Sequence, residues 1–338
     1  MTLAEGGVRV ASVGVHLPSQ IQAPPTPDAA ASESAVPLGI EHVHVAPADM
    51  IAPDLAVKAV GKASITSSRS AANVDLLLHA WTYDQGHSFW SPAHYIAREL
   101  GVTDGLISGV QQMCNGGAVS LDVAMTYLAS GRASNALLTT ADIFRGPHFD
   151  RWKSDSGIVY GDGGTALLLE HDVDARPSSH YIRKHVEVPL PHAEALHRNT
   201  SVFEHTDQAT FVDVRRTKKQ FMERYEGNFK HDMMSATSRA VKMLLDGAID
   251  DPPAQVRYAA LPRLGFTITK GTYAPSLDWC EQVDSELASH SGHLGAGDLY
   301  ANIDYAIGHA LIPPGKFGLF ISAGGGFTIS ATLMEATG

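Results

Sequence analysis

The chain has 338 residues, of which 44% are hydrophobic and 18% are charged, and its formal net charge is −11. This composition is typical of a folded globular protein and excludes disorder over most of the chain. Because the acidic balance comes with no run of Lys or Arg, we do not expect nucleic acid as a partner.

Strand and helix patterns alternate through the first hundred residues. The expected elements are a strand at Val8–Val15, a surface loop rich in Pro, Ala and Ser at Ser19–Pro37, a helix at Asp54–Ala63, a buried strand at Val74–Ala80 and a helix at Ser91–Leu100. Alternation of this kind predicts an α/β sheet.

Cys114 lies at a predicted turn between a strand and a helix. An apolar stretch at Leu106–Val110 precedes the letters MCNGG, and the apolar residues of AVSLDVAMTYLAS then recur at helical spacing until Gly131, a predicted C-cap. Further along, Ala136–Thr140 is a candidate for a buried strand, and YGDGG places a glycine turn before an apolar strand that ends at Glu170.

The second half of the chain resumes this alternation after an interruption. The segment Pro177–Gly227 is rich in His, Arg and Lys, and we expect it to pass over the active-site face. A helix at Phe229–Leu245, a strand at Val256–Leu261 and a helix at Leu299–Ala310 follow. The final letters LFISAGGGFTISATLME repeat the glycine turn and apolar strand of the first half, which predicts a duplicated unit divided near His171.

Cysteine usage and apolar runs indicate the compartment. Two cysteines, Cys114 and Cys280, are too few for a disulfide framework and suit a reducing environment. The N-terminus lacks the basic start and apolar core of a signal peptide, and no apolar run reaches the ~20 residues that span a bilayer. We therefore expect a cytoplasmic protein that does not enter a membrane.

Cys114 is the first candidate for chemistry. A thiol at the start of a helix, beside two glycines, faces the positive end of the helix dipole, which favours the thiolate. The alternative is a buried cysteine packed as a small hydrophobe, which is the commoner role of a lone Cys.

The letters SGHLGAGD place His293 and Asp298 in a glycine-rich loop before the last predicted helix. With Cys114 they would form a relay, in which His293 removes a proton from an incoming nucleophile while Asp298 fixes the imidazole tautomer. Asp298 has an equally simple alternative role, because it is placed to cap the N-terminus of that helix.

Two other patterns carry weaker signals. The run Gly324–Gly326 can bring a backbone N–H to a reacting carbonyl and, with the amide of Cys114, form an oxyanion hole, although a tight turn before a strand has the same letters. His192 and His197 in HAEALH lack the spacing of HExxH, and we expect neither a metal site nor a cofactor.

The motifs MCNGG, YGDGGTALLL, SGHLGAGD and AGGGFTISATLME resemble, in order and spacing, those of the ketosynthase III family of thiolase-fold enzymes. The resemblance implies an α/β fold of two duplicated halves in a five-layered αβαβα arrangement. Residues 1–171 would form the half with the nucleophile, and residues 172–338 the half with the His/Asp loop. It also implies a homodimer that takes acyl groups from coenzyme A or an acyl carrier protein (ACP) onto Cys114.

Two positions depart from the condensing members of that family. Those members bind an enolate with an Asn and a His, whereas this chain has His293 and Arg263 at the matching places. Decarboxylation needs donors for an enolate oxygen, but ester formation needs a base for an alcohol proton. The departures resemble a smaller ester-forming branch, the cervimycin-type malonyl transferases, which implies Cys114 as nucleophile, His293 as general base and Asp298 as its orienter.

Two further residues are predicted at the substrate. If Arg263 points into the pocket, its guanidinium would pair with the free carboxylate of a malonyl group, and a structural arginine is the alternative. Phe89 matches an aromatic residue that the family inserts across its dimer interface to shape the acyl pocket. The family's Asp-Arg contact to coenzyme A is not kept, because a Ser follows Asp155, although Arg151 and Trp152 lie nearby.

We therefore expect an O-acyltransferase that moves a short acyl group, malonyl favoured, through Cys114 to a hydroxyl of a sugar or polyketide-type acceptor in antibiotic biosynthesis. The amides of Cys114 and Gly325 would form its oxyanion hole. The alternatives are a decarboxylating 3-oxoacyl-ACP synthase III, which forms a carbon–carbon bond, and a non-catalytic partner of a polyketide synthase.

Overall fold

The computed structural model describes residues 7–25, 38–66, 72–172, 176–198 and 211–338. Strands and helices alternate in the first half of the chain, as the apolar patterns predict. Its elements are β1 (Gly7–His16), β2 (Gln20–Gln22), β3 (Val43–Val45), α1 (Ala52–Thr66), β4 (Leu76–Ala80), α2 (Pro92–Leu100), β5 (Leu106–Val110), α3 (Gly116–Ala129), β6 (Asn135–Asp142) and β7 (Gly163–Asp172).

The second half contains longer connections between its strands. Its elements are β8 (His180–Pro189), η1 (Pro191–Leu196), α4 (Val214–Arg224), α5 (Phe229–Leu245), α6 (Pro252–Gln255), β9 (Val256–Ala260), α7 (Phe266–Ile268), η2 (Thr269–Tyr273), η3 (Ala274–Leu277), β10 (Val283–Asp284), η4 (Gly295–Gly297), α8 (Asp298–Gly308), β11 (Lys316–Gly324) and β12 (Thr328–Ala336).

Both halves arrange their strands in the same way. The large sheet has the order β10-β9-β11-β12-β8-β1-β7-β6-β4-β5, so a half-sheet from each part of the chain meets the other at β1 and β8. In each half-sheet the three outer strands are parallel, and the next pairings are antiparallel. This correspondence supports the duplication predicted around His171, which stays a prediction.

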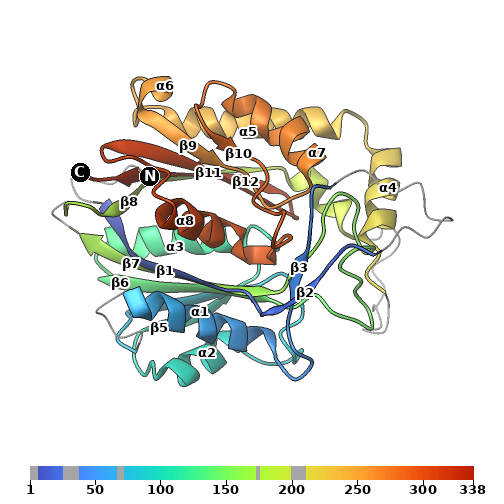
Figure 1. The fold of residues 1–338 in the computed structure, drawn as a ribbon, viewed down its shortest axis with the longest axis horizontal. Helices are drawn as coiled ribbons and strands as arrows, with labels where there is room; N and C mark the ends of the chain where they lie inside the picture. The colour runs from blue at the N-terminus through green and yellow to red at the C-terminus, as the bar shows by residue number, and fades with distance from the viewer. Residues whose placement is uncertain (1–6, 26–37, 67–71, 173–175, 199–210) are drawn as a thin grey trace.

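The half-sheets and helices stack in five layers. Figure 1 shows α3 and α8 side by side between the two half-sheets, α1 and α2 on the outer face of the first, and α5 on the outer face of the second. The predicted αβαβα arrangement is confirmed.

The two central helices bring the functional motifs together. Cys114 precedes the first residue of α3, and the loop with His293 leads into α8. The helices are joined by a hydrogen bond from the Tyr300 hydroxyl to the Gly117 carbonyl, at 2.8 Å. Because both helices are mostly apolar and lie in the core, their N-termini have little freedom to move apart.

One predicted connection contains a strand. Within Pro177–Gly227, β8 lies in the centre of the large sheet, although the sequence patterns indicated no strand there and we expected a passage over the active-site face. Residues 199–210 of that segment, and residues 26–37 of the predicted N-terminal loop, lie outside the described residues. None of the helices in the described ranges has the length and apolar character that crossing a membrane requires.

Candidate active site

Cys114 lies in the turn between β5 and α3. Met113 has a φ of 49°, a left-handed conformation that side-chain-bearing residues rarely adopt, and the chain turns there from strand to helix. The following backbone packs against the end of β11, because a Cβ at Gly324 would overlap the nitrogen of Asn115. Asn115 is also held by a hydrogen bond from its Nδ2 to Ser330 Oγ, at 2.8 Å. The C-terminal glycine run therefore reaches the predicted nucleophile.

His293 and Asp298 are hydrogen bonded to each other. Nδ1 of His293 donates to Oδ2 of Asp298 at 2.7 Å, and both side chains are buried. The Asp298 carboxylate also accepts backbone N–H groups from Leu294 at 2.9 Å and from Arg263 at 2.8 Å. The N-cap of α8 is Gly297. Asp298 thus holds the imidazole and its loop instead of capping the helix.

The free ring nitrogen of His293 belongs to the pocket that contains Cys114. Burial lowers the pKa of His293, but the charges of Asp298 and Cys114 and the hydrogen bond to Asp298 outweigh it and raise the pKa well above its ordinary value. Nε2 is buried, and no described residue meets full hydrogen-bond geometry with it. Nε2 is therefore the ring nitrogen directed to Cys114, whose charge and hydrogen bonding both contribute to the raised pKa of His293.

A pocket of about 950 Å³ contains Cys114, His293, Gly324 and Gly325 in its walls. Most of the lining is apolar, and Tyr160 contacts the His293 ring edge-on at 5.4 Å between centroids. The aromatic residues of the lining are Tyr83, Phe144, Phe149, Tyr160, Phe229, Tyr273 and Phe327. Sulfur, imidazole and glycine run thus face one largely apolar cavity, as the predicted relay requires.

Arg263 does not reach this pocket. Its side chain is buried, and the guanidinium donates to Asn302 Oδ1 at 2.8 Å, to Ser291 Oγ at 2.8 Å and to the Leu287 carbonyl at 2.9 Å. These acceptors lie on α8 and on the segment before His293, away from the pocket lining. The prediction that Arg263 binds the substrate is wrong, because its donors are used to support the loop, and the structural alternative holds.

Phe89 is fully exposed on the connection between β4 and α2 and does not line the pocket of its own chain. A partner subunit is needed to bring such a side chain to the acyl pocket, so the expectation for Phe89 stays a prediction.

The residues near the lost coenzyme A motif are engaged within the chain. Arg151 is buried and donates both terminal nitrogens to Asp162, at 2.9 and 3.1 Å. Asp155 accepts a hydrogen bond from the Tyr160 hydroxyl at 2.7 Å and forms an ion pair with Lys218. Arg151 therefore has no free guanidinium face for a donor phosphate, since both of its terminal nitrogens bind Asp162.

His197 also lines the Cys114 pocket, although the sequence patterns gave it no role. A Cβ at Gly325 would overlap its imidazole, so the ring packs directly on the glycine run. No spacing along the chain links His197 to Gly325, and only the fold brings them together.

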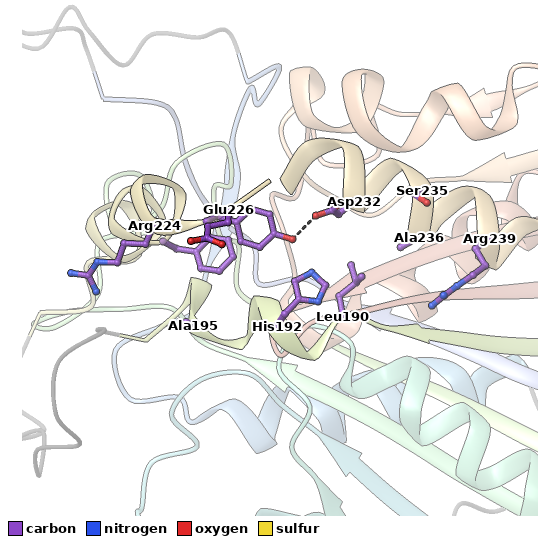
Figure 2. A pocket seen from close by; sticks show the side chains of 11 residues that line it. Leu190, His192, Ala195, Arg224, Glu226, Asp232, Ser235, Ala236 and Arg239 are labelled. Carbon is purple, nitrogen blue, oxygen red and sulfur yellow. Dashed lines mark hydrogen bonds between the residues drawn. The ribbon is translucent and has the colours of Figure 1, made fainter. Parts of the chain in front are cut away.

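His192 and His197 of HAEALH lie in different pockets. His192 lies in a separate pocket of about 660 Å³ between η1, α4 and α5 (Figure 2), where its ring stacks on Tyr225 at 5.8 Å. In the same pocket the Tyr225 hydroxyl donates to Asp232, as the dashed line in Figure 2 marks. Within the described ranges no three His, Cys, Asp or Glu side chains are grouped so that they could hold a metal ion.

Comparisons with known sequences match the motifs around Cys114. The family model of 3-oxoacyl-[acyl-carrier-protein (ACP)] synthase III matches residues 109–186. The chain is 25% identical over 304 residues to the beta-ketoacyl-[acyl-carrier-protein] synthase III of Hyphomonas neptunium, covering 88% of each chain. It is 34% identical over 133 residues to the protein of the same name from a Ruegeria species, covering 39% of this chain and 40% of that one.

Solved structures share the fold over nearly the whole chain. ChlB3, described as an acyltransferase, matches with a TM-score of 0.85 at 23% identity and covers 98% of both chains. The 3-oxoacyl-(acyl carrier protein) synthase III of Pseudomonas aeruginosa matches with a TM-score of 0.77 at 19% identity, covering 98% of this chain and 99% of that one. AbyA1, a tetronic acid condensing enzyme, matches with a TM-score of 0.73 at 20% identity, covering 97% and 100%. The chain therefore shares the thiolase fold of these structures, and its sequence is similar to the 3-oxoacyl-ACP synthases III around Cys114 and, at lower identity, over most of its length.

Proposed function

We propose that this protein is an acyltransferase that holds an acyl group on Cys114 and passes it to a hydroxyl, with His293 as general base and Asp298 as its orienter. The observation that carries the proposal is the hydrogen bond from His293 to Asp298 at the wall of the Cys114 pocket. A carboxylate-held imidazole beside a thiol is suited to moving protons to and from a reacting group.

Acylation begins when the Cys114 thiolate attacks the carbonyl carbon of a donor thioester. The carbonyl electrons move onto oxygen, and the amides of Cys114 and Gly325 stabilise this oxyanion. As the tetrahedral adduct collapses, the bond to the donor sulfur breaks, and the departing thiolate takes the proton of the His293 imidazolium. The products are acyl-Cys114, a free thiol and a neutral His293.

Transfer uses the neutral His293. Acylation removes the charge of Cys114, which is one cause of the raised pKa of His293, so the imidazole holds a proton less strongly. It takes the proton of the acceptor hydroxyl while that oxygen attacks the acyl carbon and the bond to the Cys114 sulfur breaks. The ester leaves, and Asp298 stabilises the new imidazolium.

The favoured acyl group is malonyl, delivered by coenzyme A or an acyl carrier protein. With Arg263 engaged elsewhere, support for an anionic group comes from Lys219 and Lys230 in the pocket lining, where Lys218 is paired with Asp155 and Arg215 donates to backbone carbonyls. No Asp or Glu of the described residues lines it. A volume of about 950 Å³ also suits a large acceptor, such as a sugar or polyketide-type molecule of antibiotic biosynthesis.

We also infer a homodimer. Phe89 is fully exposed, the neighbouring Trp90 is partly exposed, and Leu106 is exposed on β5, the last strand of its half-sheet. Exposed apolar side chains beside a free strand edge are typical of an interface.

Decarboxylating condensation is the second candidate, and His197 is the observation that favours it. The condensing members of the family use two donors for the enolate. Arg263 does not enter the pocket, but His197 does, so the pocket has a second imidazole beside His293. The two functions differ in what remains on the enzyme, because condensation releases carbon dioxide from malonate and ester formation keeps it.

Intact-protein mass spectrometry after incubation with malonyl-coenzyme A and malonyl-ACP tests the proposal. We expect a malonyl adduct in the wild type, no adduct in Cys114→Ala and a normal adduct in Cys280→Ala, the matched control at the other cysteine. An acetyl adduct with release of carbon dioxide would favour condensation instead. Absence of every adduct, or an adduct that survives Cys114→Ala, would refute the acyl-enzyme.

A further inference from the structure

His197 is a second histidine in the pocket of Cys114, and the relay of Cys114, His293 and Asp298 does not use it. It follows the last residue of η1 and lines the pocket together with Cys114, His293 and Gly325. It therefore reaches the site from a connection of the second half, independently of the loop that carries His293.

The His197 ring lies against Gly325, whose amide is assigned to the oxyanion hole. A Cβ on Gly325 would overlap Nδ1 and Cε1 of His197, so the edge of the ring with Nδ1 faces the glycine backbone. Nδ1 is buried, and no described residue is its hydrogen-bond partner. A buried nitrogen without a partner destabilises the folded chain, and a ligand atom beside Gly325 would supply the missing hydrogen bond.

The surroundings keep His197 neutral. Burial and the positive charge of Lys218 lower its pKa to about 4, with a smaller contribution from His293 and against the opposing charge of Asp155. A neutral imidazole has one N–H donor, and a pKa of about 4 keeps the ring neutral near neutral pH. The pKa values of the two histidines in the pocket are thus shifted in opposite directions, which favours the cation for His293 and the neutral ring for His197. His293 is then suited to carry a proton, and His197 to act as a fixed hydrogen-bond donor.

We propose that His197 is a further catalytic residue, whose Nδ1–H donates a hydrogen bond to the oxyanion that forms on the Cys114 adduct beside the Gly325 amide. The inference rests on the proposed acyl-enzyme but not on the acceptor that follows. No bond of His197 is made or broken. Its proton stays on the ring while negative charge grows on the carbonyl oxygen, and the hydrogen bond strengthens in the transition state.

Two substitutions separate hydrogen bonding from packing. His197→Phe keeps a ring against Gly325 but removes the donor, whereas His197→Gln keeps an N–H donor. His192→Phe is the matched control, because His192 lies in η1, which ends directly before His197 in the chain, but in the other pocket (Figure 2). The readout is the single-turnover rate of Cys114 acylation by malonyl-coenzyme A, followed by intact mass at several donor concentrations and pH values.

We expect His197→Phe to slow acylation at saturating donor by about 10²- to 10³-fold, as loss of one oxyanion donor does elsewhere. The donor concentration at half-saturation and the shape of the pH profile should stay as in the wild type, because His197 binds the transition state and does not titrate in that range. His197→Gln should recover a large part of the rate, and His192→Phe should acylate normally. A wild-type rate in His197→Phe, or equal losses in the Phe and Gln variants, would overturn the inference.

This experiment separates the two proposals. If the wild type is acylated and His197→Phe is slow, yet no acceptor yields an ester, the role of His197 stands and the ester-forming function fails. If neither malonyl nor acetyl thioesters nor p-nitrophenyl acetate acylate the wild type, both proposals fail.

Discussion

Replacing Asp298 by Asn should slow the transfer of an acyl group from Cys114 much more than its loading. A hydroxyl with a pKa near that of water, about 15.7, attacks only as it loses its proton. A donor thiol has a pKa of about 8.5 and leaves without much help. His293 therefore matters most in the transfer step, and Asp298 acts through His293.

The size of the effect follows from what the carboxylate contacts. Oδ2 accepts from both His293 and the backbone of Arg263, and Oδ1 accepts from Leu294. If the Asn oxygen faces His293, the tautomer is kept but the charge that stabilises the imidazolium is lost. If its NH₂ faces His293, Nδ1 becomes an acceptor and Nε2 carries the proton, so the base is blocked. Either orientation should cost about 10²- to 10⁴-fold in transfer, or about 3–5 kcal/mol.

The pH dependence gives a second, independent readout. In the wild type, transfer requires neutral His293 and should rise with pH through the raised pKa of that group. Asp298→Asn removes the charge and hydrogen bond that raise the pKa, so the midpoint of the rise should move to lower pH. The rate at the plateau should nevertheless be lower, since the imidazolium has lost its partner.

The assay needs no knowledge of the acceptor. Acyl-enzyme is prepared by incubation with the donor and desalted, and loss of the adduct to water is followed by intact mass across pH. Asp304→Asn serves as control, because Asp304 lies on α8 two turns beyond Asp298 and is only partly buried. Adduct loss in Asp298→Asn at the wild-type rate and with the wild-type pH profile would show that the hydrogen bond has no part in the chemistry.

Three further changes test the surroundings of the site. Arg263→Met leaves buried acceptors without a donor and should lower the free energy of unfolding in urea by roughly 2–5 kcal/mol, while the mass of the Cys114 adduct stays the same. The control Arg98→Met, on the exposed face of α2, should change neither the free energy of unfolding nor the adduct. Burial raises the pKa of Asp142 to about 7, so the folded state binds its proton more tightly and its contribution to stability falls as pH rises from about 4 to about 7. Asp142→Asn should remove that component, on the order of a few kcal/mol, from unfolding free energies measured across this range. Gly324→Ala should abolish acylation, because the added methyl displaces the backbone beside Cys114, and normal acylation in a folded Gly324→Ala protein would contradict this.

Much of the fold follows from apolar spacing. The strands β4, β6 and β7 are almost wholly buried, and their sequences are short apolar runs between turn residues. The helix α5 has the predicted bounds, because one face packs on the second half-sheet while the other stays polar.

The strand β8 escaped prediction for a physical reason. It lies between β1 and β12 in the centre of the sheet, yet it contains Arg183, Lys184 and Glu187 among its apolar residues. His185 is buried and bonded to Thr332 at 2.9 Å, and the pairing with β12 shifts register between Leu333 and Met334. A strand with buried polar partners and an irregular register does not alternate cleanly, so period-two patterning misses it.

One part of the candidate site can be predicted from the sequence, and the other part depends on the tertiary fold. His293 and Asp298 are five residues apart in one loop, and local chain geometry is enough to predict their pairing. The directions of Arg263 and His197 depend on which distant groups are available, namely Asn302 and Ser291 for the guanidinium and Gly325 for the imidazole. A long side chain turns to whichever acceptors the tertiary fold supplies, which a position in the sequence does not specify.

The two departures from the condensing pattern act on one loop. The backbone N–H of Arg263 donates to the oxygen of Asp298 that also binds His293, and its guanidinium holds Ser291, two residues before His293. An imidazole at position 263 would lack the reach of a guanidinium with several donors, and the segment before His293 would lose that support. Arg263 is therefore better understood as a residue that supports His293 than as a replacement for the enolate-binding His that binds a malonyl carboxylate instead. On the family resemblance, exchange at the two positions then has a single physical consequence, a histidine fixed by a carboxylate in place of the expected enolate-binding amide.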